Sequence, residues 1–200
     1  MKKILILLII FVCTGCTVVR IDTKNLDNVT SVILSKDNKL NNRVGKGYKY
    51  YVPRGVFYID SNGFNEKLYA SGNYYYLFVD AISYYHKKDT VCVFDENAYY
   101  TKEINSNNKK GCLQVNKINN EYFIRFFYNY ARIEATVTEK DLGKAVLDSS
   151  YILSTVKFND TIIKTYLDED YFNQESVYDK YTSNSDVDNF YRTEIEKGGE

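Results

Sequence analysis

The sequence of 200 residues contains no tryptophan, one proline, one methionine and one histidine, His86. Because the common hydrolytic triads and most zinc sites use histidine, either assignment would depend on that single residue. His86 stands before two lysines at the end of a predicted strand, which is typical of a surface side chain. The scarcity of histidine argues against a hydrolase and a zinc site. We predict no catalytic residue, no cofactor and no metal ligand.

The sequence also lacks an N-terminal apolar run long enough to cross a membrane. The run at residues 4–12 has nine residues, whereas a helix that spans a bilayer needs about 20. Two lysines precede this run, and Thr14 and Gly15 stand directly before Cys16. A positive start, a short apolar run and small residues at the end are typical of an export signal that is removed from the mature protein.

These residues resemble the lipobox of bacterial lipoproteins, in which a peptidase cuts after a small residue and the new N-terminal cysteine carries diacylglycerol. A third acyl chain is often added in that family. The resemblance implies that residues 1–15 are a signal peptide and that Cys16 is the lipid attachment site. Cys13 stands where leucine is usual and is the alternative attachment site. The protein is then expected at the cell membrane, anchored by lipid and facing the extracytoplasmic side.

Cysteine is rare outside this signal, since only Cys92 and Cys112 remain once Cys13 and Cys16 are set aside. Export would place both thiols where oxidation is possible. Both fall in predicted strands, where cysteine also serves as a small hydrophobic residue. A disulfide between them and two separate thiols remain open alternatives. Neither has a Cys-x-x-Cys partner, which argues against thiol redox catalysis.

The abundant residues are aromatic, with 21 tyrosines and 11 phenylalanines, and such residues favour strands. The zero net charge hides an asymmetry between the two parts of the chain. Residues 16–166 contain 21 basic and 16 acidic residues, whereas residues 167–200 contain 3 basic and 10 acidic residues. The basic residues are spread along the chain rather than gathered in one stripe, so we do not expect a nucleic acid partner.

Several β-rich segments are separated by short turns, and successive strands joined in this way predict an antiparallel meander. Pro53-Arg54-Gly55 is interpreted as a turn, in one reading that of a hairpin, and Gly72-Asn73 as a tight hairpin turn. A longer polar loop is predicted at residues 105–111. The predicted strands are residues 48–52, 56–59, 68–71, 74–85, 89–94, 99–104 and 112–118, followed by 122–137 as one long strand or two pieces.

One clear helix is predicted, at residues 138–156. Thr138 is a candidate N-cap, and acidic residues in the first turn suit the positive end of the helix dipole. Apolar residues recur every three or four positions and give one apolar face. Gly143 weakens a helix by up to about 1 kcal/mol relative to alanine. The predicted class is α+β, an antiparallel sheet with one amphipathic helix near the C-terminal end packed on it.

The chain is accordingly divided into four parts. Residues 1–15 are the signal peptide, and residues 16–46 are the lipid anchor and a spacer with a possible first strand at residues 29–34. Residues 47–167 are the α+β globular domain, in which residues 161–167 are a short docking segment. Residues 168–200 lack apolar periodicity and are rich in acidic and polar residues, so we predict a disordered acidic tail.

The order of an antiparallel sheet followed by a helix resembles the PsbP/Mog1-like domains, which also occur as bacterial lipoproteins. Two short pieces carry the resemblance, Leu-Ser-Thr-Val-Lys-Phe at residues 153–158 and the Pro-x-Gly turn at residues 53–55. The arrangement covers residues 48–158. The resemblance implies a non-enzymatic accessory or assembly role, with no family active site to carry over.

The expected function is that of an exported, membrane-anchored lipoprotein acting as a non-enzymatic accessory or protein-binding module at the cell envelope. Its partners would be the membrane, through the lipid anchor, and an envelope protein. The alternative is a lipoprotein that binds a cell-wall glycan or small solute, because tyrosine rings stack on such ligands. Exposed tyrosines clustered on one sheet face would favour that alternative, and an enzyme would need His86 in a concave site with acidic neighbours.

Overall fold

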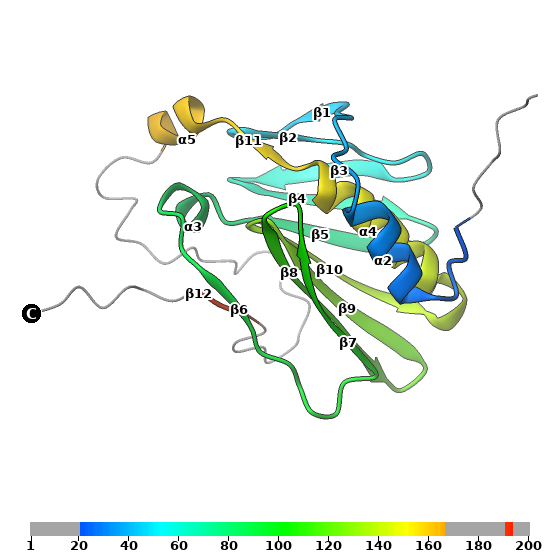
Figure 1. Cartoon of the computed structure of the whole chain (residues 1–200). Helices are drawn as coiled ribbons and strands as arrows, with labels where there is room; N and C mark the ends of the chain where they lie inside the picture. Colours follow the sequence, from blue (N-terminus) through cyan, green and yellow to red (C-terminus); the bar gives the residue numbers. More distant parts are fainter. Residues whose placement is uncertain (1–20, 167–190, 194–200) are drawn as a thin grey trace, which may run out of the picture.

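The computed structural model describes residues 21–166 and 191–193, which form an α+β fold (Figure 1). A seven-stranded antiparallel sheet, a three-stranded sheet and a two-stranded sheet are present in these residues. The elements are α2 (Leu26–Leu34), β1 (Arg43–Val44), β2 (Tyr48–Tyr50), β3 (Phe57–Asn62), β4 (Asn65–Ala70), β5 (Asn73–Val79), α3 (Ala81–Tyr85), β6 (Thr90–Cys92), β7 (Tyr100–Ser106), β8 (Lys109–Ile118), β9 (Glu121–Tyr128), β10 (Ala131–Thr138), α4 (Glu139–Thr155), β11 (Lys157–Phe158), α5 (Asp160–Tyr166) and β12 (Tyr191–Thr193).

The large sheet has the strand order β3-β4-β5-β10-β9-β8-β7. Strands β3 to β5 are neighbours in sequence order. The chain then passes through α3 and β6 to the opposite edge of the sheet, where β7 begins a second run of neighbours that ends with β10 beside β5. The predicted antiparallel sheet is confirmed, but the single meander is in fact two meanders that meet at the centre. The pattern of β5 explains its central place, because Leu77 is buried on one face and Phe78 on the other.

Two-residue turns make the hairpins of this sheet. Asn107 and Asn108 both have positive φ, 54° and 58°, the left-handed conformation that asparagine tolerates. The loop predicted at residues 105–111 is therefore only this turn, and both strands continue up to it. A second such turn, at Asn129 and Tyr130, divides the segment predicted as residues 122–137 into the antiparallel pair β9 and β10.

The predicted C-terminal helix is confirmed as α4, which begins directly after Thr138 at the N-cap position. Its apolar face, including Val146 and Ile152, is fully buried against the face of the large sheet that carries Ile133. Figure 1 shows α2 and α4 side by side on that face. The core thus lies between the two helices and the sheet.

The possible first strand at residues 29–34, within the spacer predicted at residues 16–46, is not a strand. Leu26–Leu34 form the helix α2 instead. The side chain of Asn25 accepts a hydrogen bond from the backbone N–H of Asn28 and caps this helix. Val29 and Ile33, one turn apart, are buried, and α2 packs on α4. The globular domain therefore includes α2 and β1 and begins well before residue 47.

Two further strand predictions need correction. The Pro53-Arg54-Gly55 turn does not close a hairpin, because β2 pairs with β1 and β11 in the small sheet whereas β3 pairs with β4. The strand predicted as residues 74–85 ends at Val79, where the side chain of Asp80 accepts a hydrogen bond from the backbone N–H of Ser83 and starts α3. Short-range polar capping ends an apolar run that by itself favours a strand.

The C-terminal segments are only partly described. The docking segment predicted at residues 161–167 is α5, whose Ile163 is fully buried. The tail predicted at residues 168–200 lies outside the described residues except for Tyr191–Thr193. These three residues form β12 and pair with β6.

Candidate functional site

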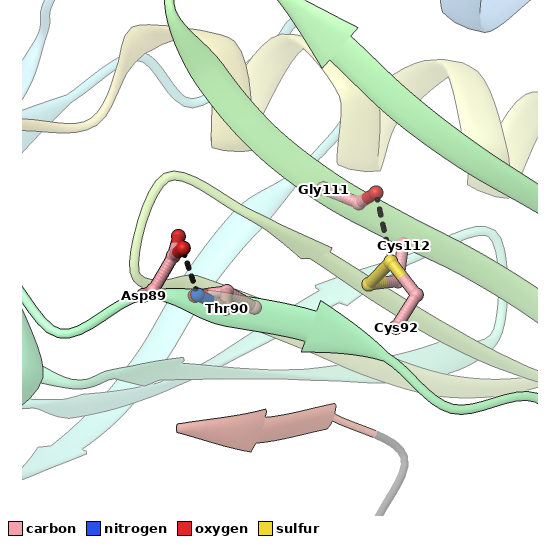
Figure 2. Close-up of a disulfide and its surroundings, with 5 residues drawn as sticks. All are labelled: Asp89, Thr90, Cys92, Gly111 and Cys112. Carbon is pink, nitrogen blue, oxygen red and sulfur yellow. Dashed lines mark hydrogen bonds between the residues drawn. A yellow bond between two sulfur atoms is a disulfide. The ribbon is translucent and has the colours of Figure 1, made fainter. Parts of the chain in front are cut away.

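The predicted lipid attachment residue, Cys16, and its alternative, Cys13, lie outside the described residues. Cys92 of β6 and Cys112 of β8 are joined by a disulfide, with their Cα atoms 5.7 Å apart (Figure 2). The sequence left open a disulfide or two separate thiols, and the structure has the disulfide. Cys112 is fully buried beside Phe127 on the sheet face opposite α4. The bond therefore ties β6, which pairs with β12, to the large sheet.

His86 is the C-cap residue of α3, and its ring meets the edge of the Tyr85 ring with centroids 5.6 Å apart. It lines neither of the two cavities described below. Within the part of the chain that the structure describes, no group of three or more His, Cys, Asp or Glu side chains is arranged to hold a metal ion.

The tyrosines divide into a buried and a partly exposed set. Tyr50 and Tyr75, for example, are fully buried in the core. On the sheet face opposite α4, Tyr69 and Tyr74 are cross-strand partners with ring centroids 5.2 Å apart. The ammonium of Lys67 lies 4.1 Å from the Tyr74 ring centroid, and Tyr74 is 46% exposed. Among the described residues, this pair most resembles the tyrosine-lined binding face that the alternative function requires.

Farther along the same face, cations lie over phenylalanine rings. The guanidinium of Arg132 is 4.7 Å from the Phe78 ring centroid, and that of Arg125 is 5.2 Å from the Phe123 ring centroid. Burial lowers the pKa of Arg125 from its usual range, while the negative charge of Glu134 opposes that shift. Rings and cations therefore alternate across β5, β10 and β9.

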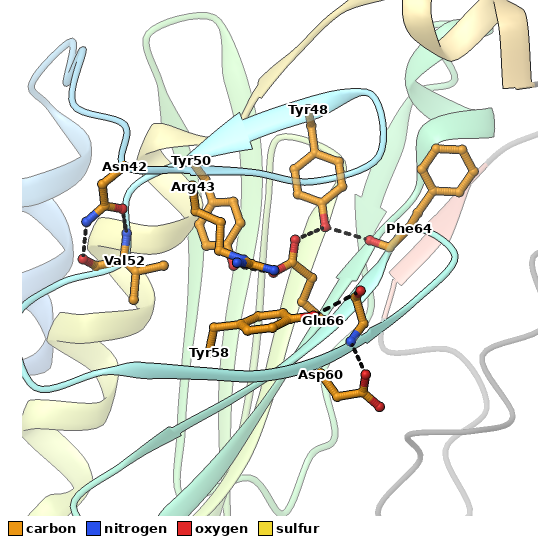
Figure 3. A network of polar contacts seen from close by, with 10 residues as sticks. Asn42, Arg43, Tyr48, Tyr50, Val52, Tyr58, Asp60, Phe64 and Glu66 are labelled. Atoms are coloured by element: carbon orange, nitrogen blue, oxygen red, sulfur yellow. Dashed lines mark hydrogen bonds and ion pairs between the residues drawn. The ribbon is translucent and has the colours of Figure 1, made fainter.

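A buried polar cluster surrounds Glu66 of β4, which is only 1% exposed (Figure 3). Oε2 of Glu66 accepts hydrogen bonds from Arg43 Nε at 2.6 Å and from the Tyr50 hydroxyl at 2.7 Å. Its Oε1 lies 2.9 Å from the Tyr48 hydroxyl, whose single proton is shared with the carbonyl of Phe64 at 2.8 Å. The buried carboxylate thus has a donor on each oxygen.

The electrostatics of this cluster keep both tyrosines protonated. Burial raises the pKa of Tyr48 and of Tyr50 well above the usual value, and the charge of Glu66 adds to the shift. Both hydroxyls therefore act as donors to the carboxylate at all physiological pH values. Because the carboxylate of Glu66 is enclosed and fully engaged, the cluster joins β1 and β2 to β4 and offers no base to a substrate.

The cluster lies beside a free sheet edge. The Arg43 guanidinium of β1 stacks 3.2 Å from the ring centroid of Tyr58 of β3, the last strand of the large sheet. All six residues of β3 are exposed. Phe57, Tyr58 and Ile59 are 62%, 37% and 49% exposed. We name these three apolar residues of β3 the β3 edge.

The backbone of the β3 edge is open to pairing in the described residues, since β4 is its only strand neighbour there. A register shift between Tyr58 and Asp60 makes Ile59 the extra residue of a β-bulge. Bulges on edge strands interrupt continuous pairing with a further strand. The β3 edge is therefore suited to a short stretch of pairing combined with apolar side-chain contact.

Two adjoining cavities open where α2 and α4 end near the β7–β8 turn. One has a volume of about 310 Å³ and is mainly polar, with Lys109 and Ser154 in its wall. The other has a volume of about 400 Å³ and is lined by Ile33 and Tyr151 among others. Lys36 lines both.

Sequence patterns did not identify Glu66, Arg43 or the β3 edge. The partners of Glu66 lie between 16 and 23 positions away along the chain, so no local sequence motif indicates them. The apolar residues of β3 did predict a strand, but an edge strand and a central strand of this length look alike in sequence.

No protein-family model matches the chain, and no curated protein sequence matches it. The resemblances to the lipobox and to the PsbP/Mog1-like domains therefore remain predictions from the residues.

Proposed function

We propose that this protein is an exported lipoprotein, anchored through Cys16 to the extracytoplasmic side of the cell membrane, that acts as a non-enzymatic protein-binding module at the envelope. The observation that carries the proposal is the order of residues 1–16, with two lysines, nine apolar residues and Thr14-Gly15-Cys16. This order matches a processed export signal.

Two features of the described residues support this proposal. Disulfides persist mainly in oxidising compartments outside the cytosol, and Cys92 and Cys112 are bonded. The first described residue, Ile21, follows Cys16 by five positions. Such a connection holds the domain within about 18 Å of an acylated Cys16.

None of the helices that the structure describes has the length and apolar character to span a membrane.

The β3 edge is the surface that we assign to the protein partner. An edge strand adds an extended segment of another protein through backbone hydrogen bonds, while apolar side chains supply specificity. Phe57 and Ile59 expose apolar surface next to the open backbone of β3. The Glu66 cluster holds the guanidinium of Arg43 over the Tyr58 ring, so Tyr58 is presented on a rigid base. The proposed partner is thus an extended strand of an envelope protein.

The alternative, binding of a cell-wall glycan or small solute, is favoured by one observation. Tyr69 and Tyr74 form a ring pair with Lys67 beside it on the sheet face opposite α4. Tyrosine rings stack on the apolar faces of sugars, and an ammonium binds sugar hydroxyls or carboxylates. Tyr74→Ala is expected to weaken glycan binding if this candidate is correct.

The anchor is tested by metabolic labelling with a fatty-acid analogue in the native host or a close bacterial relative. We expect the unaltered chain and Cys13→Ala to be labelled, and Cys16→Ala to lose the label. Retention of the label by Cys16→Ala together with its loss from Cys13→Ala would move the anchor to Cys13. No label on any of the three chains would reject the lipoprotein assignment.

The partner surface is tested by photo-crosslinking in native membranes. A photoreactive residue is placed at Ile59 in one variant and at Tyr99 in another, because Tyr99 is equally exposed but lies beside the opposite sheet edge. We expect a discrete envelope protein to be crosslinked only from position 59. Equal yields from both positions, or none, would contradict the assignment of the β3 edge.

A further inference from the structure

The polar cavity beside the β7–β8 turn has an unusual content of positive charge. Lys36 and Lys109 line it together with Asp37, and Lys157 lies close enough to Lys109 to influence its charge. Two ammonium groups and one carboxylate therefore line the cavity, and the charge of a third lysine, Lys157, reaches Lys109 from outside it. Like charges brought together at a partly buried place repel one another and destabilise the fold.

Lys109 is the central member of this group. Its side chain is half-buried, and its Nζ lies 6.0 Å from the centroid of the Tyr128 ring. Burial lowers the pKa of Lys109, the charge of Lys157 lowers it further, and Asp37 opposes the shift. A half-buried ammonium without a hydrogen-bonded anion is costly, and a bound anion would remove that cost.

Lys157 adds a second unfavourable arrangement. In the small sheet, Lys157 of β11 stands directly opposite Lys49 of β2. Like charges at directly opposed positions of an antiparallel pair are destabilising. The lysines at this end of the molecule are therefore not arranged to stabilise the domain by themselves.

An ordinary structural role for Lys109 would be to bind the carbonyl groups at the end of α2. That role is already filled. The carbonyl oxygen of Leu34, the last residue of α2, accepts hydrogen bonds from Ser106 Oγ at 3.0 Å and from Asn107 Nδ2 at 2.8 Å. Lys109 lines the cavity instead.

We propose that this polar cavity binds a phosphate group, held mainly by Lys109 and Lys36. Its volume of about 310 Å³ is at the small end of the range for ligand sites. The adjoining cavity of about 400 Å³ presents Ile33, Leu40 and Tyr151, which suit an apolar group attached to the phosphate. The ligand class is thus an organic phosphate, supplied either as a free phosphate ester or as a phospholipid headgroup. Neither the lipid anchor nor the protein partner is needed for this inference.

The test uses residues 16–200 with Cys16→Ser, so that no acyl chain is present and all described elements are retained. The melting temperature is measured against increasing inorganic phosphate and glycerol phosphate, with chloride at matched ionic strength as reference. Sedimentation with vesicles of phosphatidylglycerol or phosphatidylcholine forms the second arm. Lys109→Met keeps the apolar stem and removes the charge, and Lys117→Met is the control on the exposed end of the same strand.

We expect a phosphate-dependent rise in melting temperature that Lys109→Met abolishes and Lys117→Met retains, with an apparent Kd at least tenfold weaker in Lys109→Met. Without phosphate, Lys109→Met should melt no lower than the parent chain, because it removes like-charge repulsion. Phosphatidylglycerol binding that depends on Lys109 and is competed by glycerol phosphate would identify the lipid headgroup as the source. A Lys109-dependent effect of soluble phosphate alone would identify a free ester. If neither the rise in melting temperature with phosphate nor the binding to vesicles depends on Lys109, the proposal is wrong.

Discussion

The Glu66 cluster allows a quantitative prediction about what holds the small sheet to the large one. Glu66→Gln keeps the shape of the side chain but removes its negative charge. Three donors, Arg43, Tyr48 and Tyr50, then face a neutral amide whose NH₂ group cannot accept from any of them. The side chain of Arg43 is 27% exposed, so its charge is left only partly solvated.

Removing one partner of a buried ion pair usually costs about 3–5 kcal/mol. Because Arg43 retains some contact with water, we expect the lower end, about 3 kcal/mol less free energy of unfolding for Glu66→Gln. For a domain of this size, that loss corresponds to a melting temperature lower by about 6–12 °C. The chain has no tryptophan, so urea unfolding is followed by tyrosine fluorescence and far-ultraviolet circular dichroism.

The matched control is Glu121→Gln, an exposed glutamate at the start of β9, which should change the free energy of unfolding by less than about 0.5 kcal/mol. In Arg43→Met combined with Glu66→Gln, the loss should be smaller than the sum of the two single losses, because the first change already removes the charge that Glu66 balances. A loss below about 1 kcal/mol for Glu66→Gln alone would show that the cluster does not stabilise the domain as argued.

Three further predictions concern a helix glycine, a buried tyrosine and the disulfide. Gly143→Ala, which stabilises an ordinary helix by up to about 1 kcal/mol, should instead lower the melting temperature, because a Cβ there would meet the backbone carbonyl of Thr23; an unchanged or higher value would contradict that close approach. Burial raises the pKa of Tyr75, so the folded chain keeps a proton that the unfolded chain loses above pH 10. The free energy of unfolding should therefore fall as pH rises beyond that point. In Tyr75→Phe, this fall should be less steep by about 1.4 kcal/mol per pH unit, as measured by urea unfolding. Replacing both Cys92 and Cys112 by alanine should cost about 3 kcal/mol in the same assay, since the bond closes a loop with a sequence separation of 20; equal stability of the reduced and oxidised parent chain would contradict this.

Local signals predicted the elements whose boundaries are set by neighbouring residues. The apolar face of α4 repeats along the helix, and Thr138 and the acidic first turn mark its start, so the helix was placed within one residue at each end. The two-residue turn at Asn107 and Asn108 was taken for a longer loop, although asparagine tolerates the left-handed conformation that both residues adopt. The strands on both sides therefore came out too short.

Helix α2 shows the opposite case. Its apolar residues at 29 and 32–34 suit a strand as well as a short helix, and the segment is too short for periodicity to decide. The side-chain cap of Asn25 and the packing of Val29 and Ile33 against α4 decide in favour of the helix. Packing against a neighbour distant in sequence is not visible in the local pattern.

The sequence by itself determined the α+β class and the C-terminal amphipathic helix, because their signals come from residues that lie near one another along the chain; lipid attachment at Cys16 is predicted from a local signal of the same kind. Only the tertiary structure decided that Cys92 and Cys112 are bonded, that Glu66 is enclosed by donors from β1 and β2, and that β3 is a sheet edge. Only it brought Lys36 and Lys109 to one cavity. Those features depend on pairs of side chains separated by 16 to 73 positions, and the free energy of bringing them together comes from the whole core rather than from any local segment.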